Sequence, residues 1–204
     1  MLKIYNAAKP FIKWVGGKGQ LLTQFEANLP AELHDEEFTY IEPIVGGGAM
    51  LFFMLQNLVN IKRVVINDIN KNLTGAYKAI KEEPEGLVYR LKHIEQQYSK
   101  ISDYEEQRKY YLEMRRRFNE EQLSTIDKTA ILIFLNRTSF NGLYRVNKKR
   151  SVQRPVCYFF HRICEYFRKK AYLCSVIMNI NTYQDYGNSN KRYPDPLWRD
   201  GKNF

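Results

Sequence analysis

The chain has 204 residues, of which 44% are hydrophobic and 26% charged, a composition typical of a globular protein with a buried core. It contains no uncharged apolar run as long as the ~20 residues of a membrane helix, and residues 1–10 lack the apolar stretch of a signal peptide, so we expect a cytoplasmic protein. Three cysteines without a CxxC pair argue against a disulfide framework and a thiolate zinc site, whereas a net charge of +10 favours a polyanionic partner such as nucleic acid.

Residues 1–72 show the alternation of an α/β domain. Residues 38–44 (FTYIEPI) predict a strand, the glycines at 46–48 predict a tight turn, and the apolar run 49–55 (AMLFFML) predicts a buried helix. A second strand is predicted at residues 63–66 (RVVI), after a crossover helix. The unit is therefore βαβ, which predicts a parallel sheet.

The next part of the chain has a helical and highly charged pattern. It covers residues 71–138 and predicts an inserted helical subdomain, which we assign to residues 73–149. Within it, residues 129–135 (TAILIFL) form an apolar run that we expect to be buried. The segment that follows, residues 136–149, is a basic, glycine-containing loop that is too rich in hydrogen-bond donors to be core.

The strongest local signal is EPIVGGG, which begins at Glu42, together with Asp68, twenty residues after Gly48. Glycines between a strand and a helix let the main chain approach a ligand, and an acidic side chain after the next strand can accept hydrogen bonds from ribose hydroxyls. This spacing is compatible with an adenosine-containing cofactor. On spacing alone, it is equally compatible with a simple tight turn.

Four separated blocks carry a family resemblance. They are PFIKWVGGKGQLL at residues 10–22, EPIVGGGAMLFF at 42–53, NDIN at 67–70 and NRTSFNGLYRVNKK at 136–149. In this order they resemble the Dam-type (D12 class) family of DNA adenine N6-methyltransferases, over residues 8–149. The resemblance implies a Rossmann-like, S-adenosylmethionine-dependent methyltransferase sheet with an inserted helical target-recognition subdomain, acting as a monomer on double-stranded DNA.

The resemblance also implies roles for cofactor-binding residues. Trp14 and Lys18 would contact S-adenosylmethionine, Asp68 would bind its ribose, and its methionine end would be lined by Gly46, Gly47 and Gly48. Independently, Lys18 offers a cation to a carboxylate and Trp14 offers an aromatic face, although an isolated tryptophan is more often a core residue. No metal is implied, because the three histidines are dispersed.

The same resemblance implies DNA recognition, with a GATC-type target. Arginine reads guanine and asparagine reads adenine, and the residues suited to contact bases and phosphates are Arg137, Asn141, Arg145 and Asn147. For Arg115, Arg116 and Arg117 we prefer a solvent-exposed helix face, paired with neighbours such as Glu113 and Glu121, over a role in DNA binding.

The chain departs from the family after Lys149. The family's catalytic motif, DPPY, is absent, and Asp195 in DPLW is a weak substitute that we interpret as a chance match. Family members continue NKKGxFNVPFG where this chain reads NKKRSVQRPVC, a difference that one extra base in the lysine codons would produce. We therefore hypothesise that residues 150–204 are a frameshifted tail of a truncated enzyme. Its last part, residues 181–204, is polar and predicts a loop or disorder. A natural divergent tail is the alternative.

Two functions follow from this reading. The first is a site-specific DNA adenine N6-methyltransferase, with catalysis by this chain in question because DPPY is absent. The second is a non-catalytic DNA-binding remnant of such an enzyme. Methyl transfer separates the two hypotheses.

Overall fold

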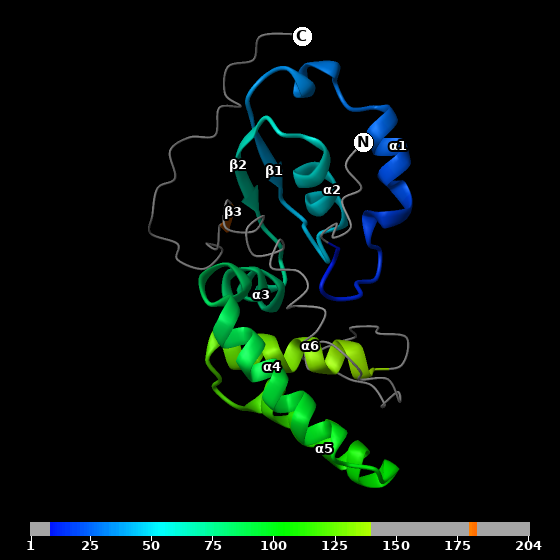
Figure 1. Ribbon diagram of the computed structural model, residues 1–204, viewed down its shortest axis with the longest axis vertical. Coiled ribbons are helices and arrows are strands. Elements are labelled where there is room, and N and C mark those ends of the chain that lie inside the picture. Colours follow the sequence, from blue (N-terminus) through cyan, green and yellow to red (C-terminus); the bar gives the residue numbers. More distant parts are fainter. Residues whose placement is uncertain (1–8, 140–179, 183–204) are drawn as a thin grey trace.

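A small parallel β-sheet forms one end of the protein, which the computed structural model describes for residues 9–139 and 180–182 (Figure 1). Strand β1 (Phe38–Glu42) pairs in parallel with β2 (Ile61–Ile66). Strand β3 (Ile180–Thr182) pairs in parallel with the other edge of β2, so the order is β1-β2-β3. The predicted βαβ unit and parallel sheet are confirmed.

The register of the sheet aligns the carboxyl ends of β1 and β2. Glu42, the last residue of β1, lies opposite Ile66, the last residue of β2. Main-chain pairing continues beyond the strands, because Asn67 N donates to Glu42 O and Val45 N donates to Asn67 O, each at 2.9 Å. The turn after β1 and the residues after β2 therefore lie side by side.

Short helices flank the sheet. Helix α2 (Ala49–Asn57) connects β1 to β2, and its apolar side chains Leu51, Phe52 and Met54 are buried. The N-terminal segment contributes the 3-10 helices η1 (Lys18–Leu21) and η2 (Ala31–His34) and, between them, helix α1 (Leu22–Ala27), which contacts α2.

Four longer helices form the other end of the molecule (Figure 1). They are α3 (Lys71–Glu82), α4 (Pro84–Ser99), α5 (Tyr104–Glu120) and α6 (Thr125–Thr138). Helix α6 packs against the other three. The helical pattern predicted for residues 71–138 is confirmed. The non-core loop predicted to begin at residue 136 is wrong for residues 136–138, which complete α6 because the buried side chains of Asn136 and Thr138 find hydrogen-bond partners there.

Local sequence explains where these helices begin. Asn70, Asp103 and Ser124 precede α3, α5 and α6, and each accepts a main-chain N–H of the first turn with its side-chain oxygen. Such caps satisfy donors that the helix itself leaves unpaired. Helix α4 begins at Pro84, whose missing N–H costs nothing at that position.

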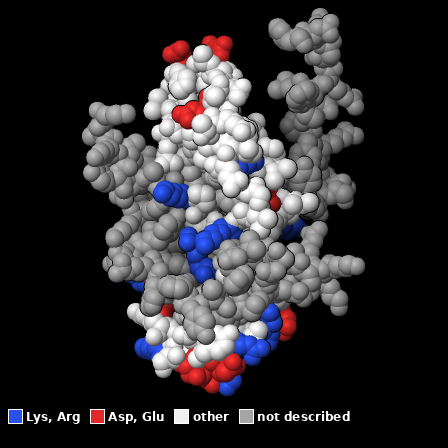
Figure 2. Space-filling model, turned by 90° about the vertical axis from the view of Figure 1, so that its right-hand side faces the viewer, with Lys and Arg blue, Asp and Glu red and all other residues white. Residues whose placement is uncertain are grey.

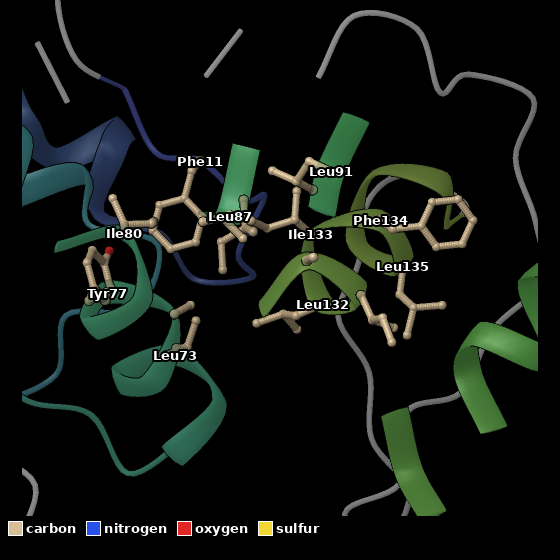
Figure 3. Packing of buried hydrophobic residues seen from close by; sticks show 14 of the residues in the cluster. Phe11, Leu73, Tyr77, Ile80, Leu87, Leu91, Leu132, Ile133, Phe134 and Leu135 are labelled. Carbon is tan, nitrogen blue, oxygen red and sulfur yellow. The ribbon is translucent and has the colours of Figure 1, made fainter. Parts of the chain in front are cut away.

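Helix α6 lies at the centre of the helical end because its middle, residues 129–135, is predominantly apolar on every side. Residues 129–135 are all buried, as predicted. The rings of Tyr98 and Tyr110 meet Phe134 edge-on, with centroids 5.3 and 5.7 Å away, and Figure 3 shows the Phe134 ring projecting from α6. Full burial of one such side chain contributes about 1.5–3 kcal/mol.

The sheet and the helices share one core. Buried side chains form a continuous cluster from Val64 of β2 through Phe11 and Tyr77 to Leu91 and Phe134 (Figure 3). Phe11 comes from the N-terminal segment, and its ring meets that of Tyr77 edge-on at 5.1 Å. The N-terminal segment is thereby packed against both ends of the molecule.

The fold bears on two further predictions, the pairing of the arginines on α5 and the loop at residues 181–204. Arg116 donates to Glu113 and Glu121, and Arg117 donates to Glu121, so the expected pairing on an exposed helix face is confirmed for these two arginines. The loop predicted for residues 181–204 is wrong at residues 181 and 182, which belong to β3, because the edge of β2 offers them main-chain partners.

Candidate functional site

A cavity of about 810 Å³ lies where the N-terminal segment faces the turn after β1. Its wall consists of most of residues 9–20, residues 44–47 with Ala49, and Arg137 at the end of α6. This volume is in the range of small-molecule and cofactor sites. Of the predicted cofactor residues, the ones that line the cavity are Trp14, Lys18, Gly46 and Gly47, whereas Gly48 and Asp68 lie outside its wall.

The glycine turn needs its glycines for two reasons. Gly46 and Gly48 have φ of +54° and +84°, in the left-handed region that strongly favours glycine. A Cβ at Gly46 or Gly47 would lie 3.2 Å from the Trp14 side chain, and a Cβ at Gly48 would collide with the Tyr77 hydroxyl. The turn is therefore both tight and closely covered by Trp14.

Asp68 holds the glycine turn from the neighbouring strand. Its Oδ2 accepts a hydrogen bond from Gly46 N and its Oδ1 accepts one from Asn70 N, both at 2.9 Å, and the residue is 9% exposed. A carboxylate has lone pairs for further donors, so these contacts leave room for another partner. The predicted contact of Asp68 with a ribose stays a prediction.

Lys18 is anchored at the carboxyl end of β1. Its ammonium donates to Glu42 Oε1 at 2.6 Å and to the main-chain oxygen of Ile44 at 2.8 Å. Glu42 is 4% exposed, and its Oε2 accepts the hydroxyl of Tyr40 at 2.8 Å. An ammonium has three N–H donors, so one more remains for a ligand. Glu42 belonged to the quoted motif, but its spacing from Lys18 gave no sign of this ion pair.

Two tyrosines support the turn in their neutral form. Tyr77, which the sequence did not single out, is fully buried, and its hydroxyl donates to Gly46 O at 3.3 Å. Burial, reinforced by the negative charges of Glu42 and Asp68, raises the pKa of Tyr77 well above its usual value. Burial and the adjacent Glu42 raise the pKa of Tyr40 in the same way. Both phenols therefore remain hydrogen-bond donors at neutral pH.

The electrostatic character of the cavity is basic. Among the described residues, its wall contains Lys9, Lys13, Lys18 and Arg137 and no acidic side chain. Figure 2 shows Lys and Arg side chains gathered over the middle of one face, with most Asp and Glu side chains of that face at its upper and lower ends. An anionic group on a ligand is therefore favoured at this cavity.

The residues expected to read DNA are only partly described. Arg137 lies at the cavity, where its Nη2 donates to Phe11 O at 2.9 Å. Its neighbour Asn136, which the sequence did not single out, bonds to the main chain of Lys13. Asn141, Arg145, Asn147 and Asp195 lie outside the described residues.

Within residues 9–139 and 180–182, no three His, Cys, Asp or Glu side chains come together as a metal site would require. No described helix combines the length and the apolar character needed to cross a membrane.

The chain is similar to known DNA methyltransferases. The family model described as D12 class N6 adenine-specific DNA methyltransferase matches residues 14–193. The Type II methyltransferase M.MjaIII of Methanocaldococcus jannaschii is 43% identical over 150 residues, which are 72% of this chain and 51% of that protein.

Two further relatives agree. The Type II methyltransferase M1.LlaDCHI of Lactococcus lactis subsp. cremoris is 33% identical over 150 residues, 72% of this chain and 47% of the relative. A DNA adenine methylase of Vibrio cholerae is 29% identical over 168 residues, 80% of this chain and 54% of the relative. The chain thus spans about half the length of these curated relatives, and the family match continues beyond Lys149.

Proposed function

Because the chain belongs to the D12 class of N6 adenine-specific DNA methyltransferases, we propose that it binds S-adenosylmethionine in the cavity between its N-terminal segment and its glycine turn. The observation that carries this proposal is the packing of Trp14 on Gly46 and Gly47 at the wall of that cavity. An aromatic side chain beside a glycine turn at the end of a parallel strand suits an adenosine-containing ligand. Bound S-adenosylmethionine supplies the activated methyl group.

The proposed roles of the site residues follow from their chemistry. Lys18 directs its third N–H to the carboxylate of the cofactor, and Trp14 offers its ring face. Asp68 accepts the ribose hydroxyls while it holds the turn. Gly46 and Gly47, which line the cavity, offer their main chain to the methionine end, and Gly48 lets the turn adopt the left-handed conformation that places them there.

DNA is the proposed second substrate. The net charge of +10 and the basic wall of the cavity favour a polyanion. We propose that a monomer binds double-stranded DNA at a GATC-type site through Arg137, Asn141, Arg145 and Asn147, within a recognition subdomain of residues 73–149. The sheet would then be part of a Rossmann-like methyltransferase fold. The Type II names of two relatives favour a role in restriction–modification.

One observation favours a second candidate function. The chain contains no DPPY, the motif whose aspartate and aromatic ring hold a flipped adenine in this enzyme class. A chain without that motif could bind cofactor and DNA and leave adenine unmodified. The second candidate is therefore a non-catalytic DNA-binding remnant of a methyltransferase.

The tail bears on the choice between these candidates. We propose that one extra base in the codons for Lys148 and Lys149 shifted the reading frame of residues 150–204. Reading the coding DNA in all three frames tests this: a strand-like segment ending in DPPY in another frame supports the shift. Codons that cannot encode GxFNVPF one base later exclude it and leave Asp195 as the residue to examine.

The cofactor proposal is tested by isothermal titration calorimetry with S-adenosylmethionine, with ATP as the control. Both ligands contain adenosine, but only the first has a methionine end for Lys18 and the glycine turn. We expect saturable binding of S-adenosylmethionine and weaker binding of ATP. Equal binding of the two, or none, would refute the assigned cofactor.

The catalytic candidate is tested by transfer of a tritiated methyl group to DNA. The substrates are a duplex with one GATC site and a matched duplex in which the target adenine is replaced. Label in the first duplex alone establishes adenine methylation and excludes the remnant. Binding of both cofactor and duplex without transfer supports the remnant.

A further inference from the structure

The end of helix α6 is tied to the N-terminal segment by a single side chain. Asn136 Oδ1 accepts a hydrogen bond from Lys13 N, and Asn136 Nδ2 donates to Lys13 O, both at 2.9 Å. These residues are 123 positions apart, and Asn136 is 2% exposed. The amide thus pairs with both main-chain groups of Lys13, as a neighbouring strand would.

This pairing fixes the main chain immediately before Trp14. A hydrogen bond on each side of Lys13 restrains the peptide from which the Trp14 side chain projects. That side chain then packs on the glycine turn so closely that a Cβ at Gly46 or Gly47 would lie 3.2 Å from it. With so little free space, a small shift of the main chain at Lys13 must move the Trp14 ring at the cavity wall.

A second set of contacts joins α6 to the same turn. Arg137 Nη2 donates to Phe11 O at 2.9 Å, and the Phe11 ring meets Tyr77 edge-on at 5.1 Å. The Tyr77 hydroxyl in turn donates to Gly46 O at 3.3 Å. Two neighbouring residues of α6 therefore reach the glycine turn from two directions.

From these contacts we propose that Asn136 is a positioning residue, which sets the place of Trp14 on the glycine turn and thereby the affinity of the cavity for S-adenosylmethionine. The inference rests on the proposed function for its ligand. It gives α6, a helix of the proposed DNA-recognition subdomain, a part in shaping the cofactor site. Asn136 itself does not line the cavity, so its effect is exerted through Lys13 and Trp14.

Tryptophan fluorescence and cofactor titration test this role together. The chain has two tryptophans, Trp14 and Trp198, so in a Trp198→Phe parent Trp14 is the only tryptophan, and its emission is recorded with excitation that tyrosine does not absorb. In this parent, Asn136→Ala should shift the emission of Trp14 to longer wavelength. Because two hydrogen bonds are lost, the same change should weaken S-adenosylmethionine binding about tenfold.

Thr138→Val is the matched control. Thr138 is buried in the same helix end, but its hydroxyl donates to Phe134 O within α6 rather than to the N-terminal segment. The control should lower the melting temperature and leave both the Trp14 emission and the cofactor affinity unchanged. If Thr138→Val moves them as far as Asn136→Ala does, general loosening of α6 explains the effect and the inference fails.

A second variant covers the case in which Asn136→Ala does not fold. Asn136→Asp keeps the shape and the acceptor for Lys13 N but has no donor for Lys13 O while ionised. Protonation of the introduced carboxyl restores a donor, so its Trp14 emission should return toward that of the parent between about pH 8 and about pH 5. Parent-like emission at a pH at which the introduced carboxyl is shown to be ionised overturns the inference.

The two proposals fail in distinguishable ways. If the parent binds no S-adenosylmethionine, the proposed function is refuted, while the emission of Trp14 still reports whether Asn136 positions it. If the parent binds the cofactor and folded Asn136→Ala binds it equally well with unshifted emission, the positioning role is wrong and the proposed function stands.

Discussion

The ammonium of Lys18 lies 2.6 Å from Oε1 of Glu42, a carboxylate that is 4% exposed and is also bonded to Tyr40. Removing one partner of a buried pair leaves a desolvated charge without compensation. Lys18 is itself 35% exposed, so water partly screens the pair. We expect Lys18→Met to lower the free energy of unfolding by about 2 kcal/mol in urea denaturation.

The chain provides a matched control for this prediction. Lys62 pairs with Glu37 at the same distance, 2.6 Å, but both side chains are more than half exposed. Lys62→Met should therefore cost at most about 1 kcal/mol. Equal costs for the two substitutions would show that burial of Glu42 does not determine the strength of its ion pair.

The glycine turn gives a second prediction, on stability. Gly48→Ala places a Cβ at φ +84°, against the Tyr77 hydroxyl, and should destabilise the protein by at least about 2 kcal/mol. Gly75→Ala is the contrast, because Gly75 lies inside α3 and its Cβ would be 3.7 Å from Thr125 Cγ2. That change should stabilise the helix by about 0.5–1 kcal/mol. Destabilisation by Gly75→Ala as large as that by Gly48→Ala would contradict the described turn.

Tyr77 predicts how stability changes at alkaline pH. Its pKa is raised in the folded protein, first by burial and then by Glu42 and Asp68. A group whose pKa is raised in the folded state contributes fully to stability below its unfolded-state pKa, which is about 10 for tyrosine. This contribution is lost as the pH rises from there through the folded-state pKa. The free energy of unfolding should fall above about pH 10, and less steeply in Tyr77→Phe. Exposed Tyr89 is the control, since Tyr89→Phe should leave the slope unchanged.

The charged surface of α5 predicts which arginines do not bind DNA. Arg116 is surrounded by Glu113, Glu120 and Glu121, so these carboxylates already offset its charge. We expect Arg116→Gln to leave the salt dependence of duplex binding unchanged. By contrast, Arg145→Gln should reduce the slope of log affinity against log salt concentration by about 1, if it removes one phosphate contact. A reduced slope for Arg116→Gln would assign α5 to the DNA surface.

Local pattern was enough to predict the elements that carry the site. Alternation and glycine placement predicted the βαβ unit, and the apolar run at residues 129–135 predicted a buried segment, because a segment that is buried on all sides is apolar in composition. That this segment is the central helix follows from the structure. Contacts between residues far apart in the sequence could not be predicted from local composition. The pairing of Asn136 with Lys13 spans 123 positions and depends on where α6 ends relative to the N-terminal segment.

Arg137 is a second residue whose distant contacts could not be predicted from the local sequence. Its residue type and its place in a basic loop motif favoured DNA contact, and the structure adds a hydrogen bond to Phe11 O and a place in the cavity wall. A guanidinium has several donors, so the two roles are compatible. Sequence identified the chemistry of this side chain, but only the packing of α6 against the N-terminal segment revealed its neighbours.

The central claim is that S-adenosylmethionine binds where Trp14 covers the glycine turn, and one titration tests it most directly. Calorimetry with S-adenosylmethionine should be performed on the unmodified chain, on Gly46→Ala and on Gly75→Ala, each confirmed to be folded by circular dichroism. A Cβ at Gly46 would press on the Trp14 ring at 3.2 Å and strain a φ of +54°. The account predicts at least about tenfold weaker binding for Gly46→Ala and unchanged binding for Gly75→Ala. Unchanged affinity in folded Gly46→Ala would contradict it.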